Sequence, residues 1–203
     1  MQTALKCNIN ISSCGSNDED TGYDTDAVTI SVKAIDLGLS VKWANCNVGA
    51  YYPEQYGGLY GWADPTGTKT SSNNNVYPSS NPPPNTCGTK YDIAREKCGG
   101  SWRLPTHTEQ TELRTQCSWT WTTYHGINGY KVVGPNGNSI FLPAAGCRNG
   151  MDIYSQGLGG FYWSGTLCTC YSSIAYGLYF RHSNVYWYYN DRSYGQSVRP
   201  VTE

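Results

Sequence analysis

We expect the core of this chain to lean on tryptophan and tyrosine. Its 203 residues include 18 Tyr, 7 Trp and only 3 Phe, and aromatic residues make up 14% of the total. Aliphatic residues are sparse, whereas Gly is abundant, with 23 residues. The length fits one domain, and this composition favours a loop-rich domain over a helical bundle.

The charge balance limits the classes of partner. Charged residues are 14% of the chain and the formal net charge is -1. Nucleic-acid binding would need a basic stripe, so we expect no nucleic-acid partner. No apolar run is long enough to span a membrane, and the N-terminus does not read as a secretory signal. A mature chain that restarts with Met after loss of a leader would look the same.

The chain divides into a polar segment and one domain. Residues 1–27 are rich in Ser, Asn and Asp, which predicts a leader or linker, and residues 28–203 form the domain. The alternation in AVTISVKAI predicts a strand over residues 27–35. The SSNNN and PPP runs predict irregular chain over residues 51–90.

Two helices are expected in the middle of the chain. One covers residues 91–97, and the other runs from 106 to about 117 and begins with a capping box made by Thr106 and Glu109. After it, alternating segments and a Pro-Asn-Gly turn at residues 135–137 predict several antiparallel strands. Two helices followed by such strands make an α+β arrangement.

The stretch over residues 160–201 has the composition of a binding surface. It holds eight of the 18 tyrosines among Ser, Gly, Asn, Asp, Arg and His, without Lys, Glu, Met or Pro before Gly195. An ordinary solvated face would carry Lys and Glu. Tyr gives large contact area, and small polar residues give adaptable hydrogen bonds. The alternative is that these tyrosines simply build the core.

Strand periodicity separates core from surface positions in this stretch. In SNVYWYYND we expect Val185 and Trp187 to be buried, with Asn184, Tyr186 and Tyr188 exposed. In IAYGLYFRH we expect Ala175, Leu178 and Phe180 to be buried. A regular strand would not turn all three side chains to the same face, which predicts a bulge near Gly177. The other expected scaffold residues, including two arginines held by carboxylate or backbone oxygens, are Tyr162, Trp163, Val198, Arg103 and Arg199.

Cysteine and histidine spacing predicts no metal site and no cofactor. The nine cysteines include no paired CxxC units, so we expect mostly buried thiols, with one or two disulfides left open. Cys168 and Cys170 are too close for an ordinary loop-closing bridge. His107, His125 and His182 share no spacing with carboxylates, and the acidic residues of the leader do not follow a calcium-loop pattern.

The chain resembles a known family in five segments: DLGLSVKWANCNVGA, GGSWRLPT, GPNGNSIFLPAAG, YWSGT and SVRPV. These are similar to the Bacteroidetes and Fibrobacter paralogous surface-protein domain, and the likeness covers residues 35–201. The resemblance implies a C-type lectin fold on the branch shared with formylglycine-generating enzymes. The expected fold class is therefore α+β, a C-type lectin fold with two helices, short antiparallel strands and much irregular loop.

The terminal segment also resembles the variable proteins of diversity-generating retroelements. In those systems random replacement of template adenines varies AAY codons, which never yield Lys, Glu, Gln, Met or Trp. Between residues 160 and 195 these types are absent except for Trp163 and Trp187. The resemblance implies a hypervariable ligand-binding face, whose candidate residues are Gly165, Cys168, Cys170, Tyr171, Ser172, Ser173, Ile174, Gly177, Arg181, His182, Asn184, Tyr186, Tyr188, Tyr189, Asn190, Asp191, Ser193 and Tyr194.

The sequence thus predicts a binding protein and not an enzyme. We expect it to recognise a protein or glycan ligand on a cell surface. The chain itself would be located on a phage virion or on a bacterial surface. One alternative is a fixed-sequence surface or fimbrial adhesin of the same fold. The other is an oxidase similar to formylglycine-generating enzymes, with Cys168 and Cys170 binding Cu(I), although those enzymes space their cysteines more widely. The oligomeric state does not follow from the sequence.

Overall fold

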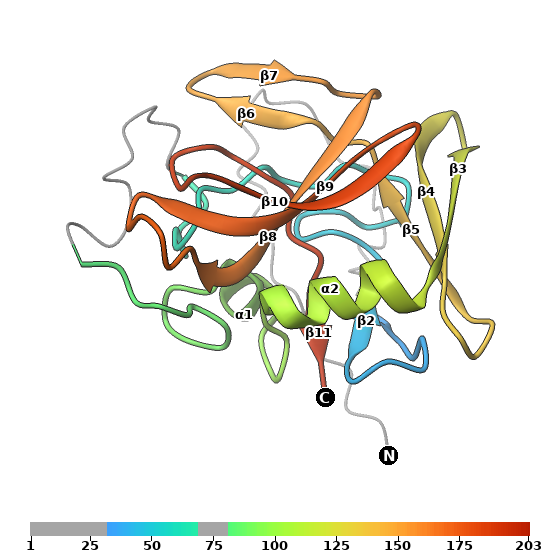
Figure 1. The fold of residues 1–203 in the computed structure, drawn as a ribbon, viewed down its shortest axis with the longest axis horizontal. Coiled ribbons are helices and arrows are strands. Elements are labelled where there is room, and N and C mark those ends of the chain that lie inside the picture. Colours follow the sequence, from blue (N-terminus) through green and yellow to red (C-terminus); the bar gives the residue numbers. More distant parts are fainter. Residues whose placement is uncertain (1–31, 69–80) are drawn as a thin grey trace, which may run out of the picture.

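The computed structural model describes residues 32–68 and 81–203 (Figure 1). The expected leader over residues 1–27 and the SSNNN run lie outside the described residues, as does most of the strand expected over residues 27–35. Within the described part the chain forms two helices and short antiparallel strands.

Both expected helices are confirmed. Helix α1 is Ile93–Cys98 and helix α2 is His107–Gln116. The side chain of Asp92 caps α1 by accepting from the backbone N–H of Ala94 at 2.8 Å. Thr106 and Glu109 form the expected capping box at the start of α2, so two otherwise unpaired backbone donors are satisfied.

The strands form three sheets of three strands and one sheet of two. Their orders are β1-β2-β11, β10-β9-β8 and β3-β4-β5, with β6-β7 as a separate hairpin. All pairs of neighbouring strands are antiparallel. The bounds are β1 (Ala34–Ile35), β2 (Lys42–Ala44), β3 (Ser118–Tyr124), β4 (Ile127–Val133), β5 (Ser139–Pro143), β6 (Cys147–Asn149), β7 (Asp152–Tyr154), β8 (Gly159–Leu167), β9 (Ile174–Arg181), β10 (Asn184–Asp191) and β11 (Val201–Thr202).

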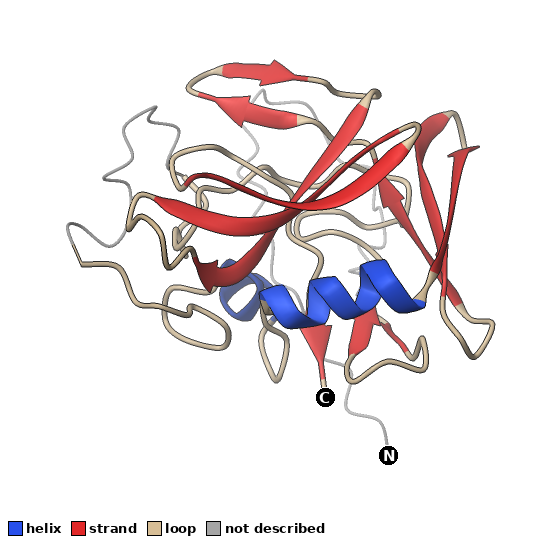
Figure 2. Ribbon diagram, in the orientation of Figure 1, coloured by secondary structure: helices blue, strands red, loops and turns tan. Residues whose placement is uncertain are grey.

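The predicted fold class is wrong. The structure is mostly β, with about 40% strand and 10% helix in four small antiparallel sheets, and no C-type lectin fold is identified. The reason is length: α1 and α2 have only 6 and 10 residues, whereas β8, β9 and β10 alone have 9, 8 and 8. In Figure 2 the two helices lie below the β8–β9–β10 sheet, and strands and loops make up the rest.

Aromatic and aliphatic side chains build the core together: the two core clusters hold eight buried Tyr, Trp and Phe residues and twelve buried Leu, Ile and Val residues. One core cluster joins Leu113 of α2 to Leu178 and Phe180 of β9, and the second is built around Trp62 and Trp163. The side chains of Trp62 and Trp163 are each 1% exposed. The indole N–H of Trp62 donates to the carbonyl of Ser164 at 2.9 Å, which satisfies its polar group inside the core.

Two arginines fix the frame through oxygen acceptors, as expected. The buried guanidinium of Arg199 donates to Asn47 Oδ1 at 2.9 Å and to the carbonyls of Ala44 and Phe141 at 3.0 and 2.8 Å. Burial lowers the pKa of Arg199. Arg103 meets both carboxylate oxygens of Glu109, at 2.7 and 2.9 Å. The contacts of Arg199 join segments that are far apart in the sequence.

Over residues 32–68 and 81–203, no helix has the length and apolar character needed to cross a bilayer.

Candidate ligand-binding surface

The Tyr-rich segment forms the twisted sheet β10-β9-β8, with β10 at its edge (Figure 1). Strand β10 pairs with β9 along its whole length, from Asn184 opposite Arg181 to Asp191 opposite Ile174. Leu178 and Phe180 of β9 are buried in the first core cluster, so one face of the sheet is anchored. This anchoring holds β10 in a defined place, which a binding strand requires.

A row of aromatic rings in contact crosses the opposite face of the sheet. Tyr179 of β9 lies 4.6 Å from Phe161, 5.4 Å from Tyr186 and 5.8 Å from Tyr188, measured between ring centroids. The guanidinium carbon of Arg181 lies 5.9 Å from the ring centroid of Tyr179. Cross-strand contacts of this kind order the side chains before a ligand arrives.

Burial changes the acidity of two of these phenols. Burial raises the pKa of Tyr179, although the neighbouring Arg181 lowers it in part, and the pKa of Tyr188 is raised first by burial and then by neighbouring groups, of which Cys147 of β6 comes first. Strand β6 therefore lies near the aromatic row. Tyr188 is half-buried, although the alternation predicts an exposed side chain, and Tyr186 is 43% exposed.

The prediction that Trp187 is buried is wrong, since its side chain is 47% exposed. Its ring meets the edge of His107 at 5.7 Å, and His107 stacks on Tyr176 at 4.3 Å. Trp187 lies on the core-facing side of the sheet, where β10 is the edge strand. Helix α2 covers only part of that side, and Trp187 packs against the first turn of the helix. Val185 is partly buried against the first core cluster, and Asn184 is exposed as expected.

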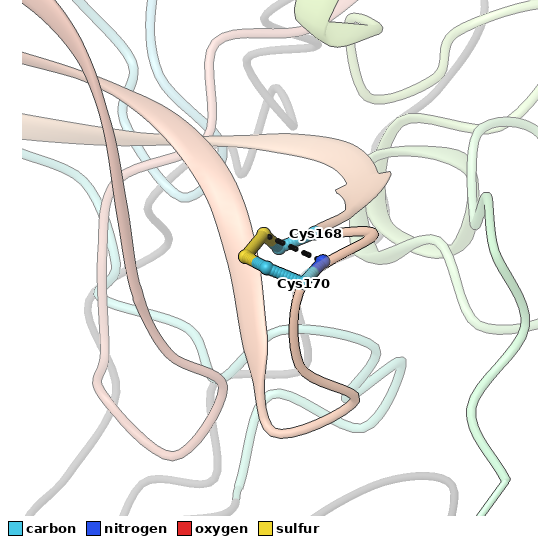
Figure 3. The surroundings of a disulfide bond; sticks show 2 residues. All are labelled: Cys168 and Cys170. Carbon is cyan, nitrogen blue, oxygen red and sulfur yellow. Dashed lines mark hydrogen bonds between the residues drawn. A yellow bond between two sulfur atoms is a disulfide. The ribbon is translucent and has the colours of Figure 1, made fainter.

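The loop between β8 and β9 contains a disulfide that the sequence argument rejects. Cys168 and Cys170 are joined, and the backbone N–H of Cys170 donates to Sγ of Cys168 at 3.3 Å (Figure 3). A tight turn brings their Cα atoms to 5.4 Å, which lies within the ordinary range for disulfides. The bridge tightens the loop next to Tyr171, whose side chain is 69% exposed.

The candidate residues fall into three groups by burial. Exposed residues are Cys170, Tyr171, Ser172, Arg181, His182, Asn184, Tyr186 and Tyr189. Half-buried residues are Ser173, Ile174, Tyr188, Asn190, Asp191 and Tyr194. Buried residues are Gly165, Cys168, Gly177 and Ser193.

The four buried candidates cannot contact a ligand on this surface. A Cβ atom at Gly165 would overlap Sγ of Cys87, and one at Gly177 would lie 2.7 Å from the carbonyl oxygen of Tyr162. Cys168 and Ser193 are 2% and 4% exposed. These positions are fixed by packing between segments, which the sequence pattern does not reveal.

The expected bulge is displaced from Gly177 to the neighbouring strand. Pairing of β9 with β10 is regular, whereas the pairing of β8 with β9 shifts register between Trp163 and Leu167. Strand β9 needs no bulge because both of its faces are covered: Ala175 packs in the second core cluster, and Leu178 and Phe180 pack in the first.

A second exposed apolar group, missed in the sequence, surrounds the β6–β7 hairpin. Met151, Ile153, Tyr154 and Leu158 are between 49% and 83% exposed. The dipeptide Asn149-Gly150 is a hairpin signal that could have located this turn.

We call the exposed residues of β10, the 181–184 hairpin and the 170–172 loop the β10 surface. It consists of Cys170, Tyr171, Ser172, Arg181, His182, Ser183, Asn184, Tyr186, Trp187 and Tyr189. No group of three or more His, Cys, Asp or Glu side chains placed to hold a metal ion occurs over residues 32–68 and 81–203. The chemistry that the β10 surface offers is stacking and hydrogen bonding.

Comparison with known proteins adds a family without an assigned activity. A family model described as a domain of unknown function (DUF8237) matches residues 119–201, which include the whole β10 surface. No curated protein and no solved structure matches the chain.

Proposed function

We propose that this chain binds a protein or glycan ligand through the β10 surface, on a phage virion or a bacterial cell surface. The observation that carries the proposal is the exposure of four aromatic side chains, Tyr171, Tyr186, Trp187 and Tyr189, along one edge strand and its adjoining loop. Tyr186 lies on the Tyr179 face of β10, whereas Trp187 and Tyr189 lie on the opposite face, so these side chains gather along the free edge of the sheet. Exposed aromatic groups gathered on one part of a folded protein mark interaction sites.

The polar residues of the β10 surface suit recognition. Arg181, His182 and Asn184 stand at one end of β10, and the 170–172 loop adjoins the other end. Aromatic anchors at a surface supply most of the binding energy, and adaptable polar groups around them supply specificity. The stacking of Tyr186 on Tyr179 lowers the entropy that Tyr186 loses when a ligand binds.

We further propose that a diversity-generating retroelement varies this surface. Every residue of the β10 surface except Trp187 is of a type that an altered AAY codon encodes. Of the two tryptophans in the segment, Trp163 is core and Trp187 would be a constant anchor among variable neighbours. The DNA decides: we expect a nearby template repeat whose mismatches fall at adenines, together with a reverse transcriptase gene. If both are missing, the chain is a fixed-sequence adhesin with the same surface.

The copper-oxidase alternative gains no support from the geometry. Cys168 and Cys170 are joined to each other, and the side chain of Cys168 is buried. The pair therefore does not present two thiolates to a Cu(I) ion in this state.

A binding screen against bacterial surface proteins and glycans tests the site. The ligands found with the natural chain would be measured again with the double variant Tyr186→Ala/Tyr189→Ala, and we expect affinity to fall by about tenfold or more. Tyr52→Ala is the matched control, because Tyr52 is 57% exposed but lies in the loop before Pro53. If a ligand binds the double variant with unchanged affinity but no longer binds Tyr52→Ala, the ligand is bound by another surface of the molecule.

A further inference from the structure

A separate cleft of about 470 Å³ lies on the outer face of the β3-β4-β5 sheet. Tyr130 and Val132 of β4 are buried in the first core cluster, so Lys131 between them projects to the opposite face. Phe141 of β5 pairs with Lys131 and lines the same cleft. The volume is within the range of small-molecule sites, about 300–1,000 Å³.

The walls of the cleft are largely apolar. Ile35 of β1 and Pro53 face the sheet, and Tyr124 and Thr122 of β3 line the remaining side. The rings of Tyr124 and Phe141 lie 5.5 Å apart and are inclined by 50°. An apolar or aromatic ligand body would therefore meet two aromatic rings at an angle that favours edge contacts.

The aromatic floor has a fixed shape. A Cβ atom at Gly129 would lie 2.7 Å from Cζ of Phe141, so the glycine gives the phenyl ring the room that it occupies across β4. The side chain of Phe141 is only 7% exposed, and its carbonyl accepts from Arg199 at 2.8 Å. The floor is thus part of the rigid frame and is present before a ligand binds.

One positive charge stands in this cleft without a carboxylate partner. Lys131 is the one charged side chain among the described residues that line it, and none of the described Asp or Glu side chains approaches its ammonium within 4.0 Å. Glu54 adjoins the wall at Pro53, but its carboxylate is bonded to Nδ1 of His125 at 3.0 Å. The hydroxyl of Thr122 adds a hydrogen-bonding group.

We infer that this cleft binds a small organic carboxylate with an apolar body. The body lies between Phe141, Tyr124 and Ile35, and the carboxylate meets the ammonium of Lys131. Charge complementarity selects the anion, because a charge-assisted hydrogen bond to Lys131 is stronger than one to a neutral ligand. The inference is independent of the ligand-binding role of the β10 surface.

The test compares an acid with its neutral amide. The full chain is titrated with 3-phenylpropionate and with 3-phenylpropionamide by isothermal calorimetry, and the ring signals of its three phenylalanines are followed by NMR. We expect the acid to bind with a dissociation constant near 1 mM or lower and the amide about tenfold more weakly. The Phe141 signals should shift, whereas those of Phe161 should not.

Substitution at Lys131 assigns the charge. Lys131→Met keeps an unbranched side chain in β4 and should abolish the preference for the acid over the amide. Lys90→Met is the matched control, because Lys90 is exposed in the segment before α1, outside the lining of the cleft, and it should leave the preference unchanged. The inference is overturned if the natural chain binds the acid and the amide equally, or if the Phe141 signals do not shift up to about 10 mM ligand. Both measurements use the natural chain, so they decide the question even if Lys131→Met does not fold.

Discussion

Oε1 of Glu54 lies 3.0 Å from Nδ1 of His125, and this contact ties the loop around Pro53 to the tip of the β3–β4 hairpin. His125 has a φ of 47° and Gly126 a φ of 82°, so both residues of the two-residue turn adopt left-handed backbone. Such a turn suits the twist of a hairpin, and Asn-Gly is its preferred sequence. The histidine therefore serves the contact with Glu54 and not the turn itself.

Replacing His125 by Asn should separate these two roles. Asn accepts left-handed backbone, so we expect the hairpin to persist while the contact with Glu54 is lost. The side chain of His125 is 67% exposed, and a pair of this kind contributes only about 0.2–1 kcal/mol. A double-mutant cycle with Glu54→Gln, read from urea unfolding, measures that coupling. Coupling far above this range would mean that the loop and the hairpin are joined by more than the contact between these two side chains.

Acid should weaken the fold through Glu109. Burial raises the pKa of this carboxyl, but hydrogen bonds from Arg103 and Thr106 outweigh burial, and the net pKa is lowered. A carboxyl with a lowered pKa in the folded state binds fewer protons folded than unfolded, so its stabilisation is present above the ordinary Glu pKa. That stabilisation is lost as the pH falls through the lowered folded value.

Glu109→Gln should remove this part of the acid dependence. The carboxylate of Glu109 lies 2.7 Å from Arg103 and closes the capping box of α2. We therefore expect the variant to lose about 1–3 kcal/mol of unfolding free energy at neutral pH. The difference in unfolding free energy between the natural chain and the variant should shrink as the pH is lowered to about 3, roughly one unit below the ordinary Glu pKa. Glu96→Gln on the exposed side of α1 is the control for removal of one carboxylate. A difference that stays constant with pH would assign the effect to packing.

Local signals in the sequence were sufficient where the partners are close in the chain. The capping box of α2 needs only Thr106 and Glu109, three residues apart, and both helices form where the sequence predicts them. The exposure of Trp187 depends on which strand lies at the sheet edge and where α2 begins, and neither fact is visible in VYWYY. The fold class failed for a related reason, since it depends on how long each element becomes once the sheets assemble.

Gly165 shows the same limit and gives a direct test. A Cβ atom there would overlap Sγ of Cys87 and lie 2.9 Å from the backbone nitrogen of Cys87. We therefore expect Gly165→Ser to destabilise the fold by about 1–3 kcal/mol, the usual cost of overpacking. Ser172→Tyr, at an exposed candidate position, should change stability by no more than about 0.5 kcal/mol. If a template repeat exists, natural variants should keep Gly at 165 and vary residue 172. Equal urea midpoints for the two variants would contradict this division.

The disulfide between Cys168 and Cys170 should act on the loop and not on the fold. It closes a loop of sequence separation 2, and the entropy that a crosslink removes from the unfolded chain grows with loop length, so the global effect should be below about 2 kcal/mol. Reduction should speed amide hydrogen exchange over residues 169–173 while the amides of β9 stay protected, because Leu178 and Phe180 anchor that strand in the core. Cys170→Ser should show the fast loop exchange with or without reductant, and this identifies the bridge as the cause. Since Tyr171 stands in this loop at 69% exposure, ligands that depend on it should bind the reduced chain more weakly than those that depend on Tyr186. Loss of protection in β9 after reduction would instead place the bridge among the contacts that hold the whole sheet.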